Sequence, residues 1–306
     1  TAQEFAFFGT PWLTSKQQEN DSLVIVNGIL IDGTACSGKV TIPRAGVYFM
    51  HLFPLIFTGE REKSFRIIRE GLPLVYITGD MHGDITRFKD PIFKKLKAGD
   101  VLIVCGDFGF IWNGSRQEKL LLRKLREKPF TIAFVDGCHE NFDILEHDFR
   151  VVKWRGGRAH LIAPNIFHMM RGEIFNIDGR SFFAFGGGHS QDFEFRQGRN
   201  WWQREQPTHA EINRAIHNLN DYDARVDYII THEPPASLKD CLGVDMQQRL
   251  EIHTFFEDII KQCQYRKWFF GKCHMDRFIP MKFYAMFEEV LPVESEEWRK
   301  PVRKKQ

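Results

Sequence analysis

A short apolar run that ends in Asp-x-His constrains the fold of this chain more than any other feature. Residues 74–77 are apolar and lie between Pro73 and Gly79, a pattern that favours a buried strand over a helix. Asp80 and His82 follow, two residues apart, where such a strand leaves its sheet, so both side chains are expected in a crevice beyond its carboxyl end. A carboxylate with an imidazole suits Mn, Fe or Zn. The same pair also occurs in ordinary polar loops. The choice between a metal site and a polar loop therefore depends on the residues at the other strand ends.

The composition is that of a folded protein and excludes few partners by itself. The 306 residues are 43% hydrophobic, enough for one large core or two smaller ones. The formal charge of +2 gives no argument for a nucleic-acid or membrane partner. The six cysteines form no C-x-x-C pair, which predicts reduced thiols and a cytoplasmic location. The longest apolar run, residues 47–57, is far shorter than the ~20 residues of a membrane span, so no membrane association is expected.

Three parts with different patterns follow one another along the chain. In residues 1–72, short apolar strings alternate with Gly, Asn and Pro turn signals, which predicts a small β-rich appendage of unknown role. The strings lie at residues 23–26, 40–42 and 47–49. Residues 73–292 form the main predicted domain. Residues 293–306 form a basic tail, for which a solvated terminus is the simplest interpretation.

In the main part, apolar runs alternate with helical patterns. Strands are expected at residues 74–77, 101–105, 130–135, 174–177, 182–185, 226–230 and 267–270. Helices are expected at 116–128, 208–219 and 247–261, and a helix interrupted by Pro91 is expected at 85–97. Two helices begin with a capping box, Ser115-x-x-Glu118 and Thr208-x-x-Glu211. The alternation predicts an α/β sheet with at least partly parallel strands. The closely spaced strands at 174–177 and 182–185 predict a hairpin in a second, more antiparallel sheet.

Five of the expected strands end in an Asp or a His. These residues are Asp80 with His82, Asp107, His139, His232 and His274. A single histidine after a strand is usually a hydrogen-bonded core residue. Five successive strand ends, often beside a glycine that permits close backbone approach, are hard to explain by packing alone. Together they predict a metal site.

The order of these blocks resembles the calcineurin-like metallophosphoesterase family. The blocks are Gly79-Asp80-Met81-His82-Gly83, Gly106-Asp107, Gly137-Cys138-His139-Glu140, Thr231-His232 and Gly271-Lys272-Cys273-His274. The resemblance covers residues 74–290 and implies a four-layer α/β/β/α sandwich with two metals at the sheet edge. It also implies ligands for the first metal, namely Asp80, His82 and His274. Asp107 would bridge to a second metal, His232 would bind that second metal, and His139 would protonate the leaving group or stabilise transition-state charge.

The reaction that the resemblance implies is hydrolysis of a phosphomonoester or phosphodiester by a metal-activated hydroxide. Two cations about 3.5–4 Å apart neutralise phosphate oxygens and lower the pKa of a bridging water. Asp107 suits the bridging position because a carboxylate has two oxygens, and His139 suits a general acid near neutral pH. The expected cofactors are one or two ions of Mn, Fe or Zn per chain.

Two residues depart from the family pattern, and both stand at positions that bind the second metal in the family. Cys138 stands where the family usually has Asn, and Lys272 where it has His. A Cys138 thiolate would still bind metal and would favour Zn. The Lys272 ammonium has no lone pair to donate and could instead occupy the cation's place as a fixed charge. We therefore expect a strong first site and a weak, altered or absent second one.

Substrate contacts are less defined by the sequence. Arg171, Arg196 and Arg199 lie in Gly-rich or polar loops, and guanidinium forks match phosphate geometry, although each also fits an ordinary surface arginine. Two other functions stay open. One is a metal- or phosphate-binding pseudoenzyme with an impaired second site, and the other is a nuclease, which performs the same chemistry on nucleic acid.

Overall fold

The computed structural model describes residues 24–26, 29–32, 74–190, 192–243, 250–280 and 282–295. The chain divides into two compact units, Thr1–Leu72 and Pro73–Gln306. In the first unit, β1 (Val24–Val26) and β2 (Ile29–Asp32) pair as an antiparallel hairpin. The strings expected at residues 40–42 and 47–49, and the basic tail from residue 296 onward, lie outside the described residues. Within the described part, no helix has the length and apolar character needed to cross a bilayer.

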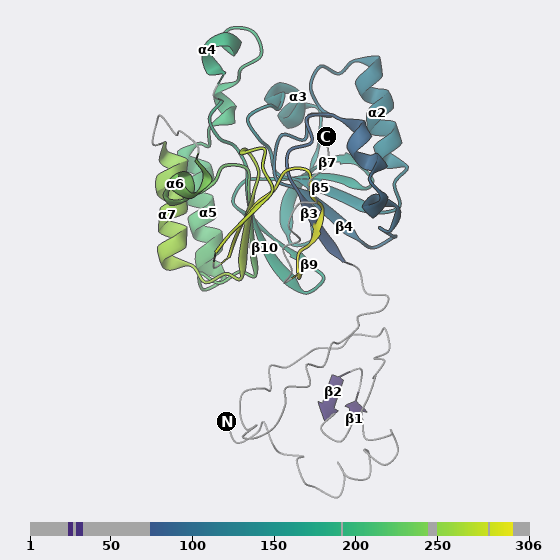
Figure 1. The fold of residues 1–306 in the computed structure, drawn as a ribbon, viewed down its shortest axis with the longest axis vertical. Helices are drawn as coiled ribbons and strands as arrows, with labels where there is room; N and C mark the ends of the chain where they lie inside the picture. Colours follow the sequence, from purple (N-terminus) through teal and green to yellow (C-terminus); the bar gives the residue numbers. More distant parts are fainter. Residues whose placement is uncertain are drawn as a thin grey trace, which may run out of the picture. The chain divides into compact units, whose positions relative to one another are not determined.

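Two sheets form the centre of the second unit (Figure 1). The seven-stranded sheet has the order β15-β3-β4-β5-β8-β7-β6, and β3, β4, β5 and β8 run parallel. Its strands are β3 (Val75–Thr78), β4 (Val101–Val104), β5 (Thr131–Phe134), β6 (Val151–Trp154), β7 (Gly157–Ala163), β8 (Ile166–Met169) and β15 (Leu291–Pro292). The six-stranded sheet has the order β13-β14-β12-β11-β10-β9, with β10, β11, β12 and β14 parallel. Its strands are β9 (Glu173–Ile177), β10 (Arg180–Phe185), β11 (Tyr228–Thr231), β12 (Lys267–Phe270), β13 (Arg277–Ile279) and β14 (Phe283–Ala285).

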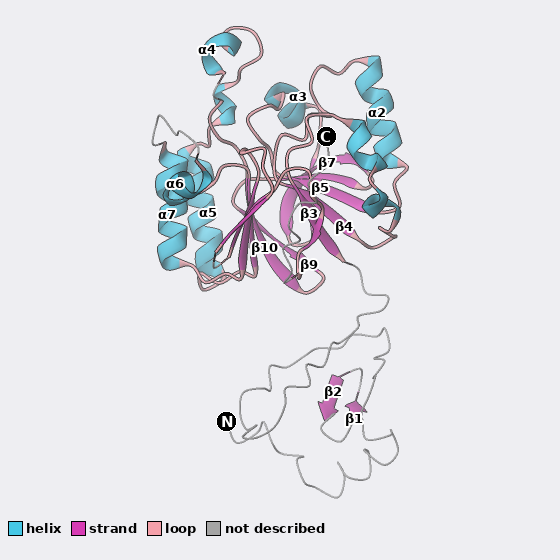
Figure 2. Cartoon of the chain, in the orientation of Figure 1, coloured by secondary structure: helices cyan, strands magenta, loops and turns pink. Residues whose placement is uncertain are grey.

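Helices cover the outer face of each sheet, which gives four layers (Figure 2). On the seven-stranded sheet these are α2 (Arg116–Arg126), α3 (Phe142–His147) and the 3-10 helices η1 (Ile85–Lys89) and η2 (Pro91–Lys94). On the six-stranded sheet they are α5 (His209–Asp221), α6 (Lys239–Leu242) and α7 (Glu251–Gln262). The short elements α4 (Phe193–Arg196), η3 (Gln203–Glu205) and η4 (Ala236–Leu238) lie in the connections after β10 and β11.

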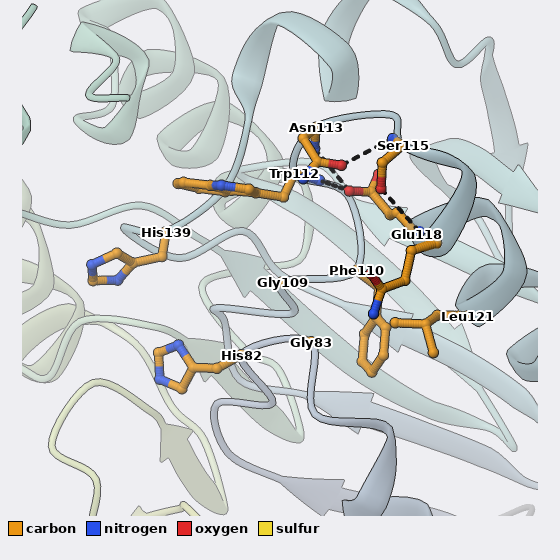
Figure 3. Close-up of a pocket in the computed structure, with 11 residues that line it drawn as sticks. His82, Gly83, Gly109, Phe110, Trp112, Asn113, Ser115, Glu118, Leu121 and His139 are labelled. Carbon is orange, nitrogen blue, oxygen red and sulfur yellow. Dashed lines mark hydrogen bonds between the residues drawn. The ribbon is translucent and has the colours of Figure 1, made fainter. Parts of the chain in front are cut away.

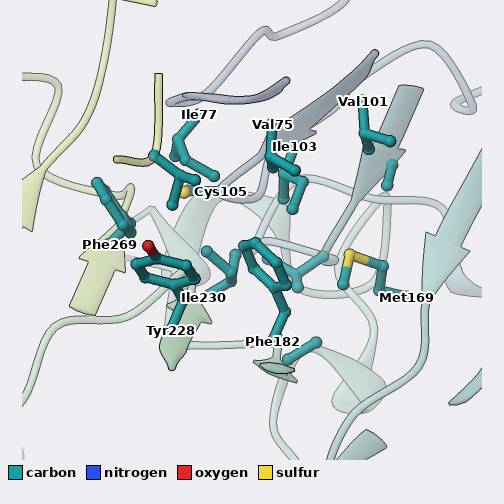
Figure 4. Close-up of a cluster of buried hydrophobic side chains, with 14 of the residues drawn as sticks. Val75, Ile77, Val101, Ile103, Cys105, Met169, Phe182, Tyr228, Ile230 and Phe269 are labelled. Carbon is teal, nitrogen blue, oxygen red and sulfur yellow. The ribbon is translucent and has the colours of Figure 1, made fainter. Parts of the chain in front are cut away.

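The two sheets pack face to face through a layer of apolar side chains (Figure 4). Val75 and Ile77 of β3 point into this layer, whereas Tyr76 between them packs in the cluster beneath the helices. This alternation follows the two-residue period of a strand. Because both faces of the strands are covered, their sequences are almost continuously apolar. The parallel strands of both sheets are thereby held in place, and their carboxyl ends lie at the same end of the sandwich.

The predicted sandwich is confirmed, including the antiparallel β9–β10 hairpin and the complete capping box between Thr208 and Glu211. The expectation that the second sheet is more antiparallel is wrong, because α5 and α7 connect β10, β11 and β12 as crossovers and three of the five strand pairings in that sheet are parallel. The helix expected at residues 85–97 is wrong. Two short 3-10 turns occupy this segment, because Pro91 lacks an N–H and begins a new turn capped by Asp90. The box at Ser115 is half formed. Ser115 accepts from the Glu118 N–H, but the Glu118 carboxylate turns away to accept from the backbone of the preceding loop.

Candidate metal centre

The loops that follow three parallel strands of the seven-stranded sheet and two of the six-stranded sheet bring the predicted ligands together at the carboxyl ends of the strands. The strands are β3, β4, β5, β11 and β12, and the residues delivered are Asp80, His82, Asp107, His139, His232 and His274. Their nitrogen and oxygen atoms form three overlapping groups, and within each group the atoms lie within 4.8 Å of one another. The groups are Asp80 with His82 and His274, His82 with Asp107 and His139, and Asp80 with Asp107 and His232.

We call Asp80, His82 and His274 the first cluster. Nε2 of His274 lies 3.2 Å from Oδ2 of Asp80 and 2.9 Å from Nε2 of His82. Asp80 is fully buried, and the Lys272 backbone N–H lies 3.1 Å from each of its oxygens. A Cβ on Gly271 would stand 2.1 Å from Oδ1 of Asp80, so only glycine allows this approach. The carboxylate is therefore held in place by the loop after β12 and presented to both histidines.

The backbone turns sharply where these side chains leave the sheets. His82, Asp107, Lys272 and His274 have φ angles of 48°, 42°, 68° and 46°. This left-handed region is unfavourable for residues with a side chain, and such strain concentrates at functional sites. The surrounding sandwich supplies the packing that keeps these turns in place.

Asp107 belongs to two of the three groups, one with His82 and His139 and one with Asp80 and His232. Its Oδ1 accepts the backbone N–H of His139 at 2.7 Å, and its Oδ2 lies 2.8 Å from Nδ1 of His139. Nε2 of His232 is 3.6 Å from Oδ1 of Asp107, while Nδ1 of His232 is 3.1 Å from the Cys105 carbonyl. The hydrogen bond to Cys105 therefore orients the His232 ring and leaves Nε2 directed at the carboxylates. That Nε2 is buried and has no hydrogen-bond partner.

The carboxylates and histidines stabilise each other's charges. Burial opposes ionisation of Asp80 and Asp107, but neighbouring histidines overcome it and hold both carboxyl pKa values below their usual range. Burial likewise works against a charged His232, but the two carboxylates raise its pKa well above the usual value. Hydrogen bonding to Asp107 raises the pKa of His139. The centre thus concentrates negative charge where a cation would be bound.

The residues present fit a divalent cation. The donors are carboxylate oxygens and imidazole nitrogens, which suit Mn, Fe and Zn. The buried, unpartnered Nε2 of His232 is the kind of atom that a bound cation would satisfy. Its other ring nitrogen contacts a backbone carbonyl, as is usual for a ligating histidine.

Cys138 and Lys272 form a separate group beside this centre, which we call the lysine cluster together with Glu233. Nζ of Lys272 lies 2.8 Å from Sγ of Cys138 and 3.4 Å from Oε2 of Glu233, and it donates to the His189 carbonyl. Burial lowers the pKa of Lys272, but the neighbouring groups outweigh it and keep the ammonium charged. Burial raises the pKa of the Cys138 thiol. The Lys272 side chain is therefore a fixed cation surrounded by acceptors.

The three arginines differ in what they contact. Arg171 is buried and donates to Asp136 and Glu211, so its guanidinium is engaged within the fold. Arg196 is also buried, donates to Ser190 and the Cys138 carbonyl, and lies 2.9 Å from Glu205. The Arg199 side chain is exposed in the turn after α4. The structure thus brings neither Arg171 nor Arg196 to the centre with a free guanidinium.

Sequence reasoning missed three groups around the centre. Glu233 contacts Lys272, and Asp192 Oδ2 lies 3.4 Å from Nε2 of His139. Arg87 donates to the carbonyls of Asp80 and Phe287, which ties the loop after β3 to the segment after β14. The position of Glu233 directly after His232 was the one available signal, since it shares the same strand end.

Comparison with known proteins agrees with this geometry. The model of the family described as calcineurin-like phosphoesterase matches residues 73–271. Among solved structures, the chain is similar to a phosphopantetheinyl hydrolase from Mycobacterium tuberculosis, with 17% sequence identity and a TM-score of 0.37. That match covers 71% of this chain and 90% of the other. No curated protein matches the chain.

Proposed function

Because the chain belongs to the calcineurin-like phosphoesterase family, we propose that it hydrolyses phosphomonoesters or phosphodiesters with one tightly bound divalent cation and one built-in ammonium. The cation would be held among the carboxylates of Asp80 and Asp107 and the histidines that face them, His82, His232 and His274. When bound there, it would withdraw charge from the phosphate and lower the pKa of a coordinated water. The ammonium is that of Lys272.

The one-cation proposal rests on the contacts of the Lys272 ammonium. Its Nζ contacts the thiol and the carboxylate of the lysine cluster and the carbonyl of His189. In the family pattern this position belongs to a histidine that binds the second metal. An ammonium placed there supplies positive charge to the phosphate but has no lone pair for a cation. The second metal ligand is thereby replaced, while a positive charge is retained.

His139 is the group that we assign to the leaving alcohol. Asp107 fixes its ring through Nδ1, which leaves Nε2 on the side of Asp192 and the open pocket. The oxygen of a water that has lost a proton to solvent bonds to phosphorus, the bond between phosphorus and the alcohol oxygen breaks, and the alcohol oxygen takes the proton from Nε2 of His139. Asp107 keeps the imidazole in the tautomer and orientation that this transfer needs. Arg199, whose side chain is exposed, stays the candidate arginine for contact with the phosphate.

The test is hydrolysis of an aryl phosphomonoester and an aryl phosphodiester with added Mn, Fe or Zn, comparing the parent protein with Asp107→Asn. We expect turnover by the parent and its loss in the variant, because the amide cannot share two oxygens with cation and imidazole. Asp221→Asn, at the exposed end of α5, is the matched control and should keep full activity. Metal analysis should give one tightly held ion per chain, and two ions would contradict the role assigned to Lys272.

A second candidate function follows from the same lysine cluster. If the ammonium disables catalysis instead of assisting it, the chain is a metal- or phosphate-binding scaffold. The folded parent would then bind Mn and inorganic phosphate without turning over either ester. Degradation of single- or double-stranded nucleic acid at low salt would instead identify a nuclease.

A further inference from the structure

An open pocket adjoins the metal centre on the side of the seven-stranded sheet (Figure 3). Its volume is about 380 Å³, within the range of about 300–1,000 Å³ that is usual for small-molecule sites. His82 and His139 line one end. The remaining wall comes from Gly83 in the loop after β3, from the loop after β4 and from the first turns of α2, with side chains that include Phe110, Trp112, Glu118 and Leu121. An alcohol that leaves toward His139 therefore has this pocket beside it.

Trp112 forms a rigid, flat wall of the pocket. Its carbonyl accepts from Nδ2 of Asn141 at 2.6 Å, and its N–H donates to Glu118 at 2.9 Å, so its backbone is fixed from two sides. The indole ring meets the Trp202 ring edge-on, with centroids 5.7 Å apart. The Arg196 guanidinium lies 5.9 Å from the centroid of the Trp112 ring. Figure 3 shows the indole extending toward the side where His139 and His82 lie.

Beyond His82 and His139 at the end next to the metal centre, the pocket wall carries no cationic side chain. None of its lining residues, all in the described part of the chain, is Lys or Arg. The one acid, Glu118, accepts from the backbone N–H groups of residues 112 and 113, so its charge is used to hold the loop. What remains is apolar surface from Phe110 and Leu121 with neutral hydrogen-bonding groups. A second phosphate or a carboxylate would find no counter-charge here.

We propose, resting on the phosphoesterase function above, that this pocket binds the leaving group and selects phosphate esters of neutral alcohols that carry a flat aromatic ring. Trp112 provides the surface on which the ring stacks. Aromatic contacts of this kind are worth about 1–3 kcal/mol. The phosphate lies at the metal centre, and the ester oxygen lies between the two, next to His139.

The experiment tests whether the pocket recognises the aromatic ring of the alcohol, and it uses two esters whose alcohols leave by the same chemistry. The substrates are 2-naphthylmethyl phosphate and ethyl phosphate, which are both esters of alkyl alcohols. We expect the parent to prefer the naphthylmethyl ester in kcat/KM, and Trp112→Ala to reduce the ratio of the two kcat/KM values about tenfold. Trp112→Phe should restore most of the preference. Trp201, which packs on Phe193 and does not line the pocket, supplies the control, and Trp201→Ala should keep the parental ratio.

Binding of 2-naphthylmethanol, followed by ligand-observed NMR, provides a readout that is independent of turnover. The alcohol should bind the parent and Trp201→Ala, and Trp112→Ala should weaken binding about tenfold. Hydrolysis without any preference, or equal binding by parent and Trp112→Ala, would overturn the pocket assignment and leave the proposed hydrolase intact. Trp112-dependent binding by a protein that hydrolyses neither ester would support the pocket and refute the proposed activity.

Discussion

The first cluster and the lysine cluster are neighbours at the carboxyl ends of the two sheets, yet one can bind a cation and the other contains one. The first cluster gathers a carboxylate and two imidazoles whose lone pairs can bind a cation. In the lysine cluster the cation is already part of the chain, at Nζ of Lys272. One loop supplies both, since Lys272 and His274 are two residues apart after β12. Under the proposed function, this scaffold would keep the positive charge of a second cation at Lys272 and lose the histidine that binds that cation in the family.

The largest expected effect comes from breaking the first cluster. His274→Ala removes one of the two imidazoles of the first cluster, so both metal affinity and kcat/KM should fall. Loss of residues that merely orient metal ligands costs about 10–100-fold, and we expect a direct ligand to cost more than about 100-fold. Metal titration and ester hydrolysis measure this. His209→Ala, at an exposed ion pair with Glu251, should match the parent, and an unaffected His274→Ala would show that the cation binds elsewhere.

Neutralising the lysine cluster should affect folding more than metal binding. Lys272→Met leaves Glu233 buried with one oxygen lacking its cation, although His253 still contacts the other at 3.2 Å. An unpaired buried polar group costs about 1–3 kcal/mol, and we expect a loss of about 2 kcal/mol in the free energy of unfolding. Urea unfolding of the metal-free protein measures it. Adding Glu233→Gln should recover part of the loss, and full additivity of the two changes would mean that they do not interact.

Converting the lysine cluster into a metal site sharpens the comparison further. The double variant Cys138→Asn, Lys272→His supplies an amide oxygen and an imidazole in place of a thiol and an ammonium. Bound metal should rise from one ion to two per chain. Turnover should rise about tenfold, equivalent to about 1.4 kcal/mol of added transition-state stabilisation. Unchanged metal content together with unchanged turnover would refute the interpretation of both positions.

The strand ends could be predicted from sequence because each combines two strong local signals. A buried strand gives an apolar run, and a glycine beside a polar residue marks the turn, as at Gly106-Asp107 and Gly271-Lys272. Such signals do not depend on distant contacts. They place Asp80 with Asp107, and His232 with His274, because parallel strands of one sheet share their carboxyl edge. The two pairs lie on different sheets and meet because the sheets pack face to face. How the ligands group there, however, depends on loop conformations that no local pattern fixes.

The contacts that sequence could not predict all depend on remote partners. Arg171 and Arg196 lie in loops with the same composition as exposed ones. Their burial follows from Asp136 and Glu205, which other segments deliver. The contact of Glu233 with Lys272 is likewise invisible in the sequence. The pocket wall depends on what the Glu118 carboxylate contacts. The capping-box pattern predicted that this carboxylate accepts from the backbone of Ser115, whereas it accepts from the backbone of residues 112 and 113.

The smallest expected effect distinguishes two roles for Cys138. If its sulfur binds metal as a thiolate, Cys138→Ser should weaken zinc binding strongly, because an alcohol is a poor ligand by comparison. The structure favours the other role. Burial raises the pKa of the thiol, and Nζ of Lys272 donates to Sγ at 2.8 Å, which a serine oxygen can also accept. We therefore expect Cys138→Ser to change zinc affinity and kcat/KM by less than about threefold.

Alkylation of Cys138 by iodoacetamide is a second measurement of the same difference. It should be slow at neutral pH, since the thiolate is the reactive form. A large loss of zinc affinity, together with rapid alkylation that zinc blocks, would make Cys138 a ligand and move the lysine cluster into the metal centre.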